Sequence, residues 1–117
     1  MKRGYRFFAL LLAMALCCVA SAGLCETSAT ESARLYLNFM AFSRQGLIEQ
    51  LEYEGFSHEE AVAAADACGA DWNEQAAKKA ESYLSFMDMS RSQLIDQLEY
   101  EGFTSEQAAY GADAVGK

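Results

Sequence analysis

The seven-residue stretch QLEYEGF occurs twice in this chain, at residues 50–56 and again at residues 97–103. Aligned on these two copies, residues 36–69 match residues 83–116 without a gap, and 21 of the 34 positions are identical. Chance recurrence on this scale is negligible in a chain of 117 residues. The constant offset of 47 residues is typical of small helical repeats. We therefore expect two copies of one structural unit.

Two helices of each copy have clear start and stop signals. Ser43 and Ser57 can cap the second and third helices, as can Ser90 and Thr104 in the later copy. Each follows an apolar residue that can pack back onto its own helix. Gly55 and its counterpart end the second helix, because glycine adopts a left-handed cap without steric cost. The third helix is rich in alanine, which favours close helix packing.

The first helix of each copy has a weaker start. In the second copy we expect Asn73 to cap a helix with one apolar face, formed by Ala76, Ala80, Leu84 and Met87. The first copy has a poorer version over residues 27–40. Trp72 is interpreted as a packing residue at the junction between the copies, since Cys25 takes its place in the first copy.

These signals predict an all-α protein with two tandem three-helix repeats after an N-terminal signal helix. Within each repeat, the second helix, glycine turn and third helix have the pattern of a helix-turn-helix. The predicted domains are a signal segment at residues 1–22, a first repeat at residues 23–70 and a second repeat at residues 71–117.

The N-terminal segment has the three parts of a secretory signal. Basic residues come first (Lys2, Arg3 and Arg6), an apolar run follows over residues 7–19, and Ala20-Ser21-Ala22 forms a small-residue cleavage site. The apolar run is shorter than the roughly 20 residues of a membrane-spanning helix, although counting on to Leu24 gives an uncleaved anchor as the alternative. We expect an exported protein that is either released or held at the outer face of the cytoplasmic membrane.

Cleavage after residue 22 leaves six basic and seventeen acidic residues, a net charge of −11. Such a chain repels phosphate backbones and anionic lipids, and it favours a basic protein partner. The third helices contain no Lys or Arg, whereas a DNA-reading helix needs them. We therefore expect no nucleic-acid partner, and membrane contact only through the N-terminal segment.

Signatures of catalysis are missing from the sequence. His58 is the only histidine and has no counterpart in the second copy, so we expect an exposed surface residue rather than a general base. No phosphate-binding loop, Cys/His metal spacing or nucleophile motif is present, and the carboxylates do not follow calcium-loop spacing. The prediction is a non-enzymatic protein without metal or cofactor.

Two cysteines, Cys25 and Cys68, follow the signal segment. In an exported chain they can form a disulfide, which would stabilise a small domain by about 4 kcal/mol through loop closure. Alternatively, Cys68 is a small buried apolar residue, because Val115 takes its place in the second copy.

The candidate partner surface lies at the ends of the two second helices. It comprises Glu52, Tyr53 and Glu54 in the first copy, and Glu99, Tyr100 and Glu101 in the second. Tyrosine flanked by carboxylates suits contact with a basic or amphipathic protein segment. In the alternative, the tyrosines pack over the turn and the acids only add solubility.

Residues 71–116 read DWNEQAAKKAESYLSFMDMSRSQLIDQLEYEGFTSEQAAYGADAVG, and this pattern closely resembles the Ltp family of host cell surface-exposed lipoproteins. Its repeats carry an Asp-Trp-Asn lead-in, a Tyr-Leu pair, a Ser-x-x-x-Leu-Ile-x-Gln-Leu core and a Glu-Gly-Phe-Thr turn. The resemblance implies helix-turn-helix-like domains displayed outside the cytoplasmic membrane of Gram-positive bacteria. Phage-encoded members block superinfection by stopping phage DNA entry through a tail component such as the tape-measure protein.

By this resemblance, Glu52, Glu54, Glu99 and Glu101 would meet a basic tail segment. The alternative function is a surface or secreted protein that binds a host or envelope partner unrelated to phage. The chain departs from the lipoprotein pattern in one respect: Cys17, Cys18 and Cys25 each lack a convincing lipobox before them. Release or an uncleaved signal segment therefore stand as alternatives to a lipid tether.

Overall fold

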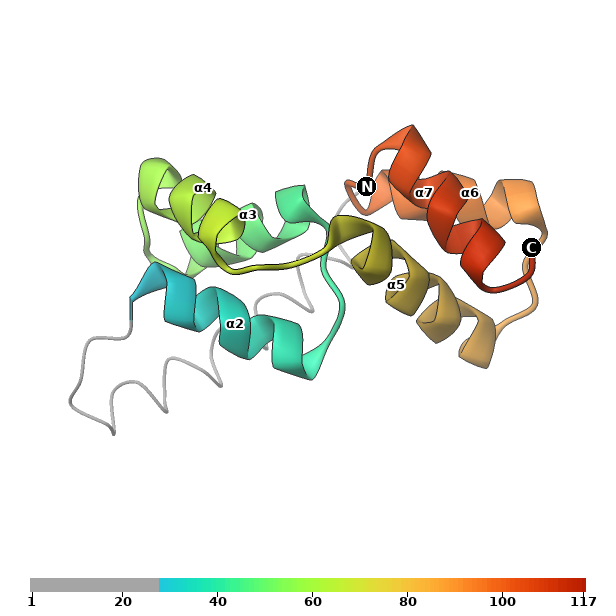
Figure 1. Cartoon of the computed structure of the whole chain (residues 1–117), viewed down its shortest axis with the longest axis horizontal. Coiled ribbons are helices and arrows are strands. Elements are labelled where there is room, and N and C mark those ends of the chain that lie inside the picture. Colours follow the sequence, from blue (N-terminus) through green and yellow to red (C-terminus); the bar gives the residue numbers. More distant parts are fainter. Residues whose placement is uncertain (1–27) are drawn as a thin grey trace.

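The computed structural model describes residues 28–117, so the expected signal segment at residues 1–22 and Cys25 lie outside the described residues. The described part contains six helices and no strand (Figure 1). They are α2 (Ala29–Phe39), α3 (Arg44–Glu54), α4 (His58–Ala67), α5 (Trp72–Phe86), α6 (Arg91–Tyr100) and α7 (Ser105–Ala114). The expected all-α fold is confirmed.

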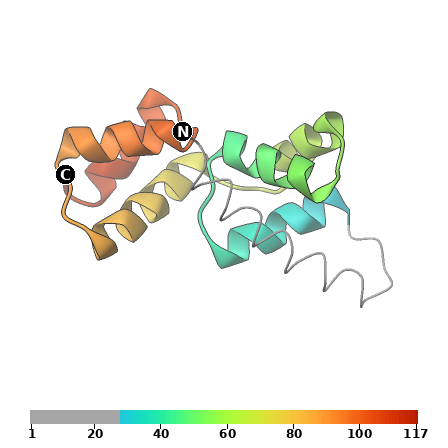
Figure 2. The same cartoon turned by 180° about the vertical axis from the view of Figure 1, so that it is seen from behind.

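The six helices form two three-helix units that lie end to end (Figures 1 and 2). Every extensive helix–helix contact is within α2–α4 or within α5–α7. Each unit has its own buried core. The first core contains Ala33, Tyr36, Phe42, Leu47, Ile48, Leu51, Ala61, Ala64 and Ala65, and the second contains Ala76, Ala80, Leu94, Leu98, Phe103, Ala108 and Ala112. The tandem repeat read from the sequence is therefore a tandem repeat of the fold.

The expected caps of the second and third helices are present. Ser43 caps α3 by accepting a hydrogen bond from the Gly46 backbone N–H at 2.9 Å. Ser57, Ser90 and Thr104 each form a full capping box with the residue three positions later. A glycine with a left-handed backbone follows each second helix, as expected: Gly55 is the C-cap of α3, and Gly102 comes directly after Glu101, the C-cap of α6. These caps and stops could be predicted from the sequence because each depends only on residues within one helical turn.

The starts of the first helices differ from the prediction. Asp71, not Asn73, is the N-cap of α5: its Oδ1 accepts hydrogen bonds from the backbone N–H groups of Asn73 (3.0 Å) and Glu74 (3.3 Å). In the first repeat, Ser28 caps α2 and forms a capping box with Glu31. Asp and Asn are equally good N-caps by residue type. The extended backbone of Asp71 (ψ 108°) places the start of α5 directly after this residue.

The predicted apolar face of α5 is wrong at its last position. Ala76 and Ala80 are buried and Leu84 packs on the core, but Met87 is 54% exposed. Met87 lies past the last helical residue and has an extended backbone, with φ −152° and ψ 154°. The chain leaves the helix before the 3.6-residue periodicity returns this side chain to the core.

The repeats meet at a small junction. Trp72, the first residue of α5, packs against the core of the first repeat, which confirms its interpretation as a junction residue. The backbone N–H of Phe42 donates to the side-chain oxygen of Gln75 at 3.0 Å. The Ser43 hydroxyl donates to the Glu101 carbonyl oxygen at 2.6 Å. The N-terminal end of α3 is thereby joined to the C-terminal end of α6.

Cys68 forms no disulfide with any of residues 28–117, and its half-buried side chain packs against the first core. Its Sγ–H donates to the Ala65 carbonyl oxygen at 3.3 Å. This position agrees with the interpretation of Cys68 as a small apolar residue, while its suggested partner lies outside the described residues. Among residues 28–117, no helix is long and apolar enough to cross a membrane.

Candidate partner-binding surface

Two of the six predicted contact residues, Glu54 and Glu101, are hydrogen-bonded to the first helix of their own repeat. Glu54, at the end of α3, accepts a hydrogen bond from the Tyr36 hydroxyl and another from the Ser32 hydroxyl at 3.3 Å. In the second repeat, Glu101 accepts from the Tyr83 hydroxyl in the same way. Both carboxylates are half-buried. They connect the second helix of each repeat to the first.

A glutamine completes each of these networks. Gln50 donates from its Nε2 to the Tyr36 hydroxyl at 3.1 Å, and Gln97 donates to the Tyr83 hydroxyl at 3.0 Å. Burial, followed by the hydrogen bond to Glu101, raises the pKa of Tyr83 above its usual 10.0. The tyrosine stays protonated and therefore remains a donor to the carboxylate.

The two networks differ at one position. Lys79 in α5 takes the place of Ser32 and is almost fully buried. Burial lowers the pKa of Lys79, and the negative charge of Glu101 partly opposes this change. The second repeat therefore holds a buried cation near its Tyr83–Glu101 pair, whereas the first has only a hydroxyl.

Glu52 and Glu99 lie on the exposed side of their helices. A carboxylate oxygen of Glu52 lies within hydrogen-bonding distance of Nδ1 of His58, whose side chain is 72% exposed. His58 is therefore a surface residue, as predicted. Within residues 28–117, no group of three or more His, Cys, Asp or Glu side chains could hold a metal ion.

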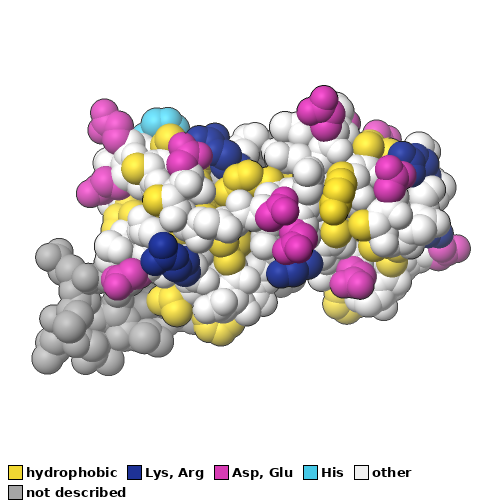
Figure 3. All heavy atoms as spheres, viewed as in Figure 1, with side chains coloured by type: hydrophobic (Ala, Val, Ile, Leu, Met, Phe, Trp, Pro, Cys, Tyr) yellow, Lys and Arg dark blue, Asp and Glu magenta, His cyan; other side chains and the backbone are white. Residues whose placement is uncertain are grey.

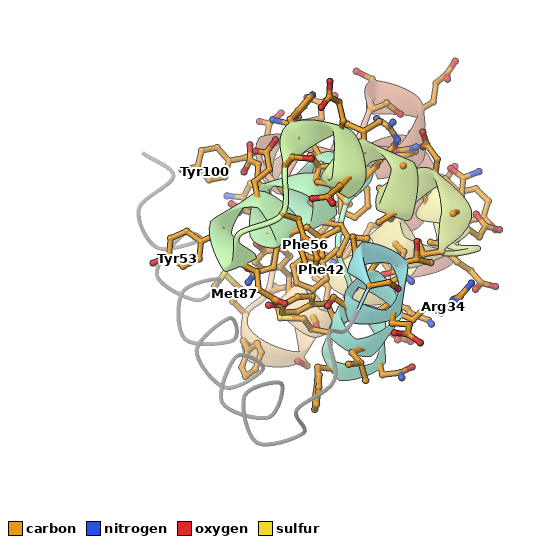
Figure 4. All side chains as sticks on the ribbon, turned by 90° about the vertical axis from the view of Figure 1, so that its left-hand side faces the viewer. Arg34, Phe42, Tyr53, Phe56, Met87 and Tyr100 are labelled. Atoms are coloured by element: carbon orange, nitrogen blue, oxygen red, sulfur yellow. The ribbon has the colours of Figure 1, made fainter. Side chains whose placement is uncertain are left out.

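The two predicted tyrosines are exposed, to 54% for Tyr53 and 45% for Tyr100. Figure 4 shows both on the same side of the molecule, directed away from the helices. Tyr53 belongs to the outer end of α3, whereas Tyr100 belongs to the end of α6 that faces the junction (Figure 1). One tyrosine from each repeat is thus presented along one side of the elongated molecule.

Exposed apolar residues at the ends of α2 and α5 were not predicted from the sequence. Phe39 and Phe86 are 65% and 84% exposed, and the methionine that follows each is also exposed. Large exposed apolar side chains often mark contact surfaces. An identical Phe-Met pair stands at this point in both copies, and that identity was the available signal.

A shallow groove of about 470 Å³ runs along α6 in the second repeat. Its lining consists of Met87, Asp88, Met89, Gln93, Asp96, Gln97 and Tyr100. The groove therefore joins one predicted tyrosine to one of the unpredicted exposed methionines. Its lining contains both apolar and acidic side chains.

Acidic side chains are spread over both repeats on the face shown in Figure 3 and do not gather in one place. Negative charge alone therefore does not define a contact site on this face. The exposed aromatic and methionine side chains distinguish particular positions on the surface better than the acidic side chains do.

A sequence model of the family described as host cell surface-exposed lipoprotein (Lipoprotein_Ltp) matches residues 25–67 and residues 71–115. The two matches cover more than half of the chain and correspond to the two three-helix units. No curated protein and no solved structure matches the chain.

Proposed function

Because the chain belongs to the host cell surface-exposed lipoprotein (Ltp) family, we propose that it is a non-enzymatic protein-binding module at the outer face of the cytoplasmic membrane. It blocks entry of phage DNA by engaging a component of the phage tail, such as the tape-measure protein. The tail segment that it binds is basic, to match the acidic surface.

The observation that carries this proposal is the presentation of Tyr53 and Tyr100 on one side of the molecule (Figure 4). Tyrosine offers a large contact area with few rotatable bonds, so little conformational entropy is lost on binding. Each tyrosine has an exposed glutamate directly before it, Glu52 or Glu99. The two copies can contact two points of one elongated partner, and such bivalent contact strengthens binding without new chemistry.

The third helices support a protein partner rather than DNA. In a DNA-binding helix-turn-helix this helix enters the major groove and uses basic or amide side chains. Here α4 reads HEEAVAAADA and α7 reads SEQAAYGADA, with acidic residues and no Lys or Arg in either. The phosphate backbone would be repelled along both helices.

The test is phage plating efficiency and phage DNA entry in cells that express the full chain. The Tyr53→Ala/Tyr100→Ala double variant should lose protection. Tyr110→Ala is the matched control, since Tyr110 is 48% exposed on α7 and lies outside the proposed surface. Immunodetection at the cell surface should show equal amounts of the three proteins.

Protection that survives the double variant would refute the role of the two tyrosines. Unchanged DNA entry with the unaltered chain, across a broad phage panel, would instead favour a surface protein with a host or envelope partner.

A further inference from the structure

We propose that the groove along α6 is the docking site for an amphipathic segment of the partner protein. The segment places a bulky apolar side chain against Met87, Met89 and Tyr100. It places Lys or Arg beside Asp88 and Asp96. This inference rests on the proposed function only in taking the partner to be a protein, and it names the chemistry of the bound segment.

The part of the groove lining that α6 supplies follows one side of this helix. Gln93, Asp96, Gln97 and Tyr100 follow one another at helical spacing on one side of α6. From Gln93 to Tyr100 the helix rises by roughly 10 Å, the length of about two helical turns of a bound peptide. Burial of an apolar helix face in such a groove is a common mode of peptide recognition.

The apolar part of the lining is adaptable. Met87 is 54% exposed at the end of α5, and Met89 is half-buried against the second core. Methionine side chains are flexible and polarizable, so they fit apolar groups of different shape. Tyr100 adds an aromatic wall at the other end of the groove.

The charge of the groove selects a basic segment. Asp88 is 99% exposed and already has an ammonium group beside it, the Nζ of Lys117 at 3.6 Å. An exposed ion pair of this kind contributes little free energy, so a partner lysine can replace Lys117 easily. Asp96 presents a second exposed carboxylate within the same lining.

The first repeat does not offer the same chemistry. Ala41 takes the place of Asp88, so one carboxylate is missing. Phe42 takes the place of Met89, is only 3% exposed and packs edge-on against Tyr36, with ring centroids 5.9 Å apart. A rigid buried ring therefore replaces the flexible methionine. The docking site is accordingly assigned to the second repeat.

Binding of a fluorescent peptide to the exported protein, purified from expressing cells, tests this assignment. The probe is a helical peptide of about 14 residues made of Leu and Lys, with all leucines on one face. A scrambled peptide of the same composition keeps the charge and loses the apolar face. Fluorescence anisotropy gives the dissociation constants.

Two pairs of protein variants separate the groove from general attraction. Met87→Ser should weaken binding about fivefold or more, whereas Phe86→Ser should not, although Phe86 is its more exposed neighbour outside the lining. Asp88→Asn/Asp96→Asn should weaken binding about fivefold or more, whereas Glu59→Gln/Glu81→Gln removes the same charge elsewhere and should have a much smaller effect.

Equal losses within either pair would overturn the assignment, as would equal binding of the scrambled peptide. Plating assays with the same variants distinguish the groove from the proposed function. Groove variants that lose the peptide but keep phage protection would support the docking site and place it outside phage exclusion. Variants that keep both activities would refute the docking site.

Discussion

Ser43 and Glu101 join the two repeats through one hydroxyl group. The Ser43 Oγ donates to the Glu101 carbonyl oxygen at 2.6 Å and also accepts from the Gly46 backbone N–H at 2.9 Å. One side chain therefore caps α3 and satisfies a carbonyl at the end of α6. The partly positive N-terminus of α3 and the partly negative C-terminus of α6 attract each other at this point.

Removal of the Ser43 hydroxyl should lower the free energy of unfolding more than removal of the hydroxyl of Ser90, its counterpart in the second repeat. Ser90 caps α6 in the same way, but its side-chain hydrogen bonds stay within its own repeat. We expect Ser90→Ala to lower the free energy of unfolding by about 1 kcal/mol through the lost cap. Ser43→Ala should cost about 2 kcal/mol, because a part-buried hydrogen bond to the other repeat is lost as well. Urea denaturation followed by circular dichroism measures both, and equal costs would contradict a stabilising junction.

The glycines that end α3 and α6 offer a second comparison across the junction. Gly55 and Gly102 have φ values of 118° and 109°, so alanine is strained at both positions. A Cβ atom at Gly55 would meet nothing within 4 Å, whereas at Gly102 it would lie 2.7 Å from Ser43 Oγ. We expect Gly55→Ala to cost about 1–2 kcal/mol from backbone strain alone.

Gly102→Ala should cost roughly 1 kcal/mol more than Gly55→Ala, because the junction must also shift. Melting temperatures of the two variants give the comparison. A smaller loss for Gly102→Ala would show that the repeats separate readily at this point.

The hydroxyl groups of Tyr36 and Tyr83 should stabilise the protein to different extents, because the two side chains differ in burial. Tyr36 is fully buried, and Tyr83 is partly exposed. Phenylalanine keeps the ring at each position and removes the donor to Glu54 or Glu101. We expect Tyr36→Phe to cost about 2–3 kcal/mol and Tyr83→Phe about 1 kcal/mol, because water can replace the lost hydroxyl more readily at the partly exposed Tyr83 than at the fully buried Tyr36. Chemical denaturation of both variants is the measurement, and the reverse order would be inconsistent with this account.

The raised pKa of Tyr83 predicts a loss of stability in alkaline solution. The contribution of Tyr83 is fully present below the unfolded pKa of 10.0 and disappears as the pH rises through the higher folded value. The lowered pKa of Lys79 makes stability rise with pH instead. Lys79 is present in both the unaltered chain and Tyr83→Phe, so its effect cancels when the two are compared. The difference in unfolding free energy between the unaltered chain and Tyr83→Phe should therefore shrink between about pH 9 and about pH 11. A constant difference over this range would count against the coupling of Tyr83 to Glu101.

The close packing of α7 on α5 leaves no room for a side chain at Gly111. A Cβ atom at Gly111 would lie 2.8 Å from the Ala76 carbonyl oxygen. Alanine favours a helix over glycine by about 1 kcal/mol, yet we expect Gly111→Ala to destabilise the protein by about 1–2 kcal/mol, since the clash is with backbone. The first repeat supplies the control, because alanine is already present at the equivalent position, Ala64. Ala64→Gly should cost about 1 kcal/mol, and a stabilising Gly111→Ala would refute the packing argument.

Local signals made much of the fold predictable. The repeat, the caps at Ser43, Ser57, Ser90 and Thr104, and the glycine stops all follow from residues within one helical turn. The start of α5 was misplaced because Asp71 and Asn73 are equally good caps by residue type. Met87 was misplaced because helical periodicity does not say where the helix stops.

The candidate surface was predictable only in part. Tyr53 and Tyr100 are exposed, as expected of a contact patch. They could be predicted because they are equivalent positions in the two copies of QLEYEGF. Glu54 and Glu101 have the same type and spacing as exposed acids, but each is hydrogen-bonded to a tyrosine 18 residues earlier. Sequence spacing does not show which side chain meets a carboxylate from another helix.

The sequence by itself determined that the chain is two copies of one helical unit, because start and stop signals act over a few residues and repeat at a constant offset. Tertiary structure decided which of the repeated residues stay accessible to a partner. It also decided how the copies meet, at Ser43 and Glu101, and that Met87, Asp88 and Tyr100 line one groove of the second repeat. These outcomes depend on contacts between helices that are distant in the chain, and such contacts arise only when the whole unit packs.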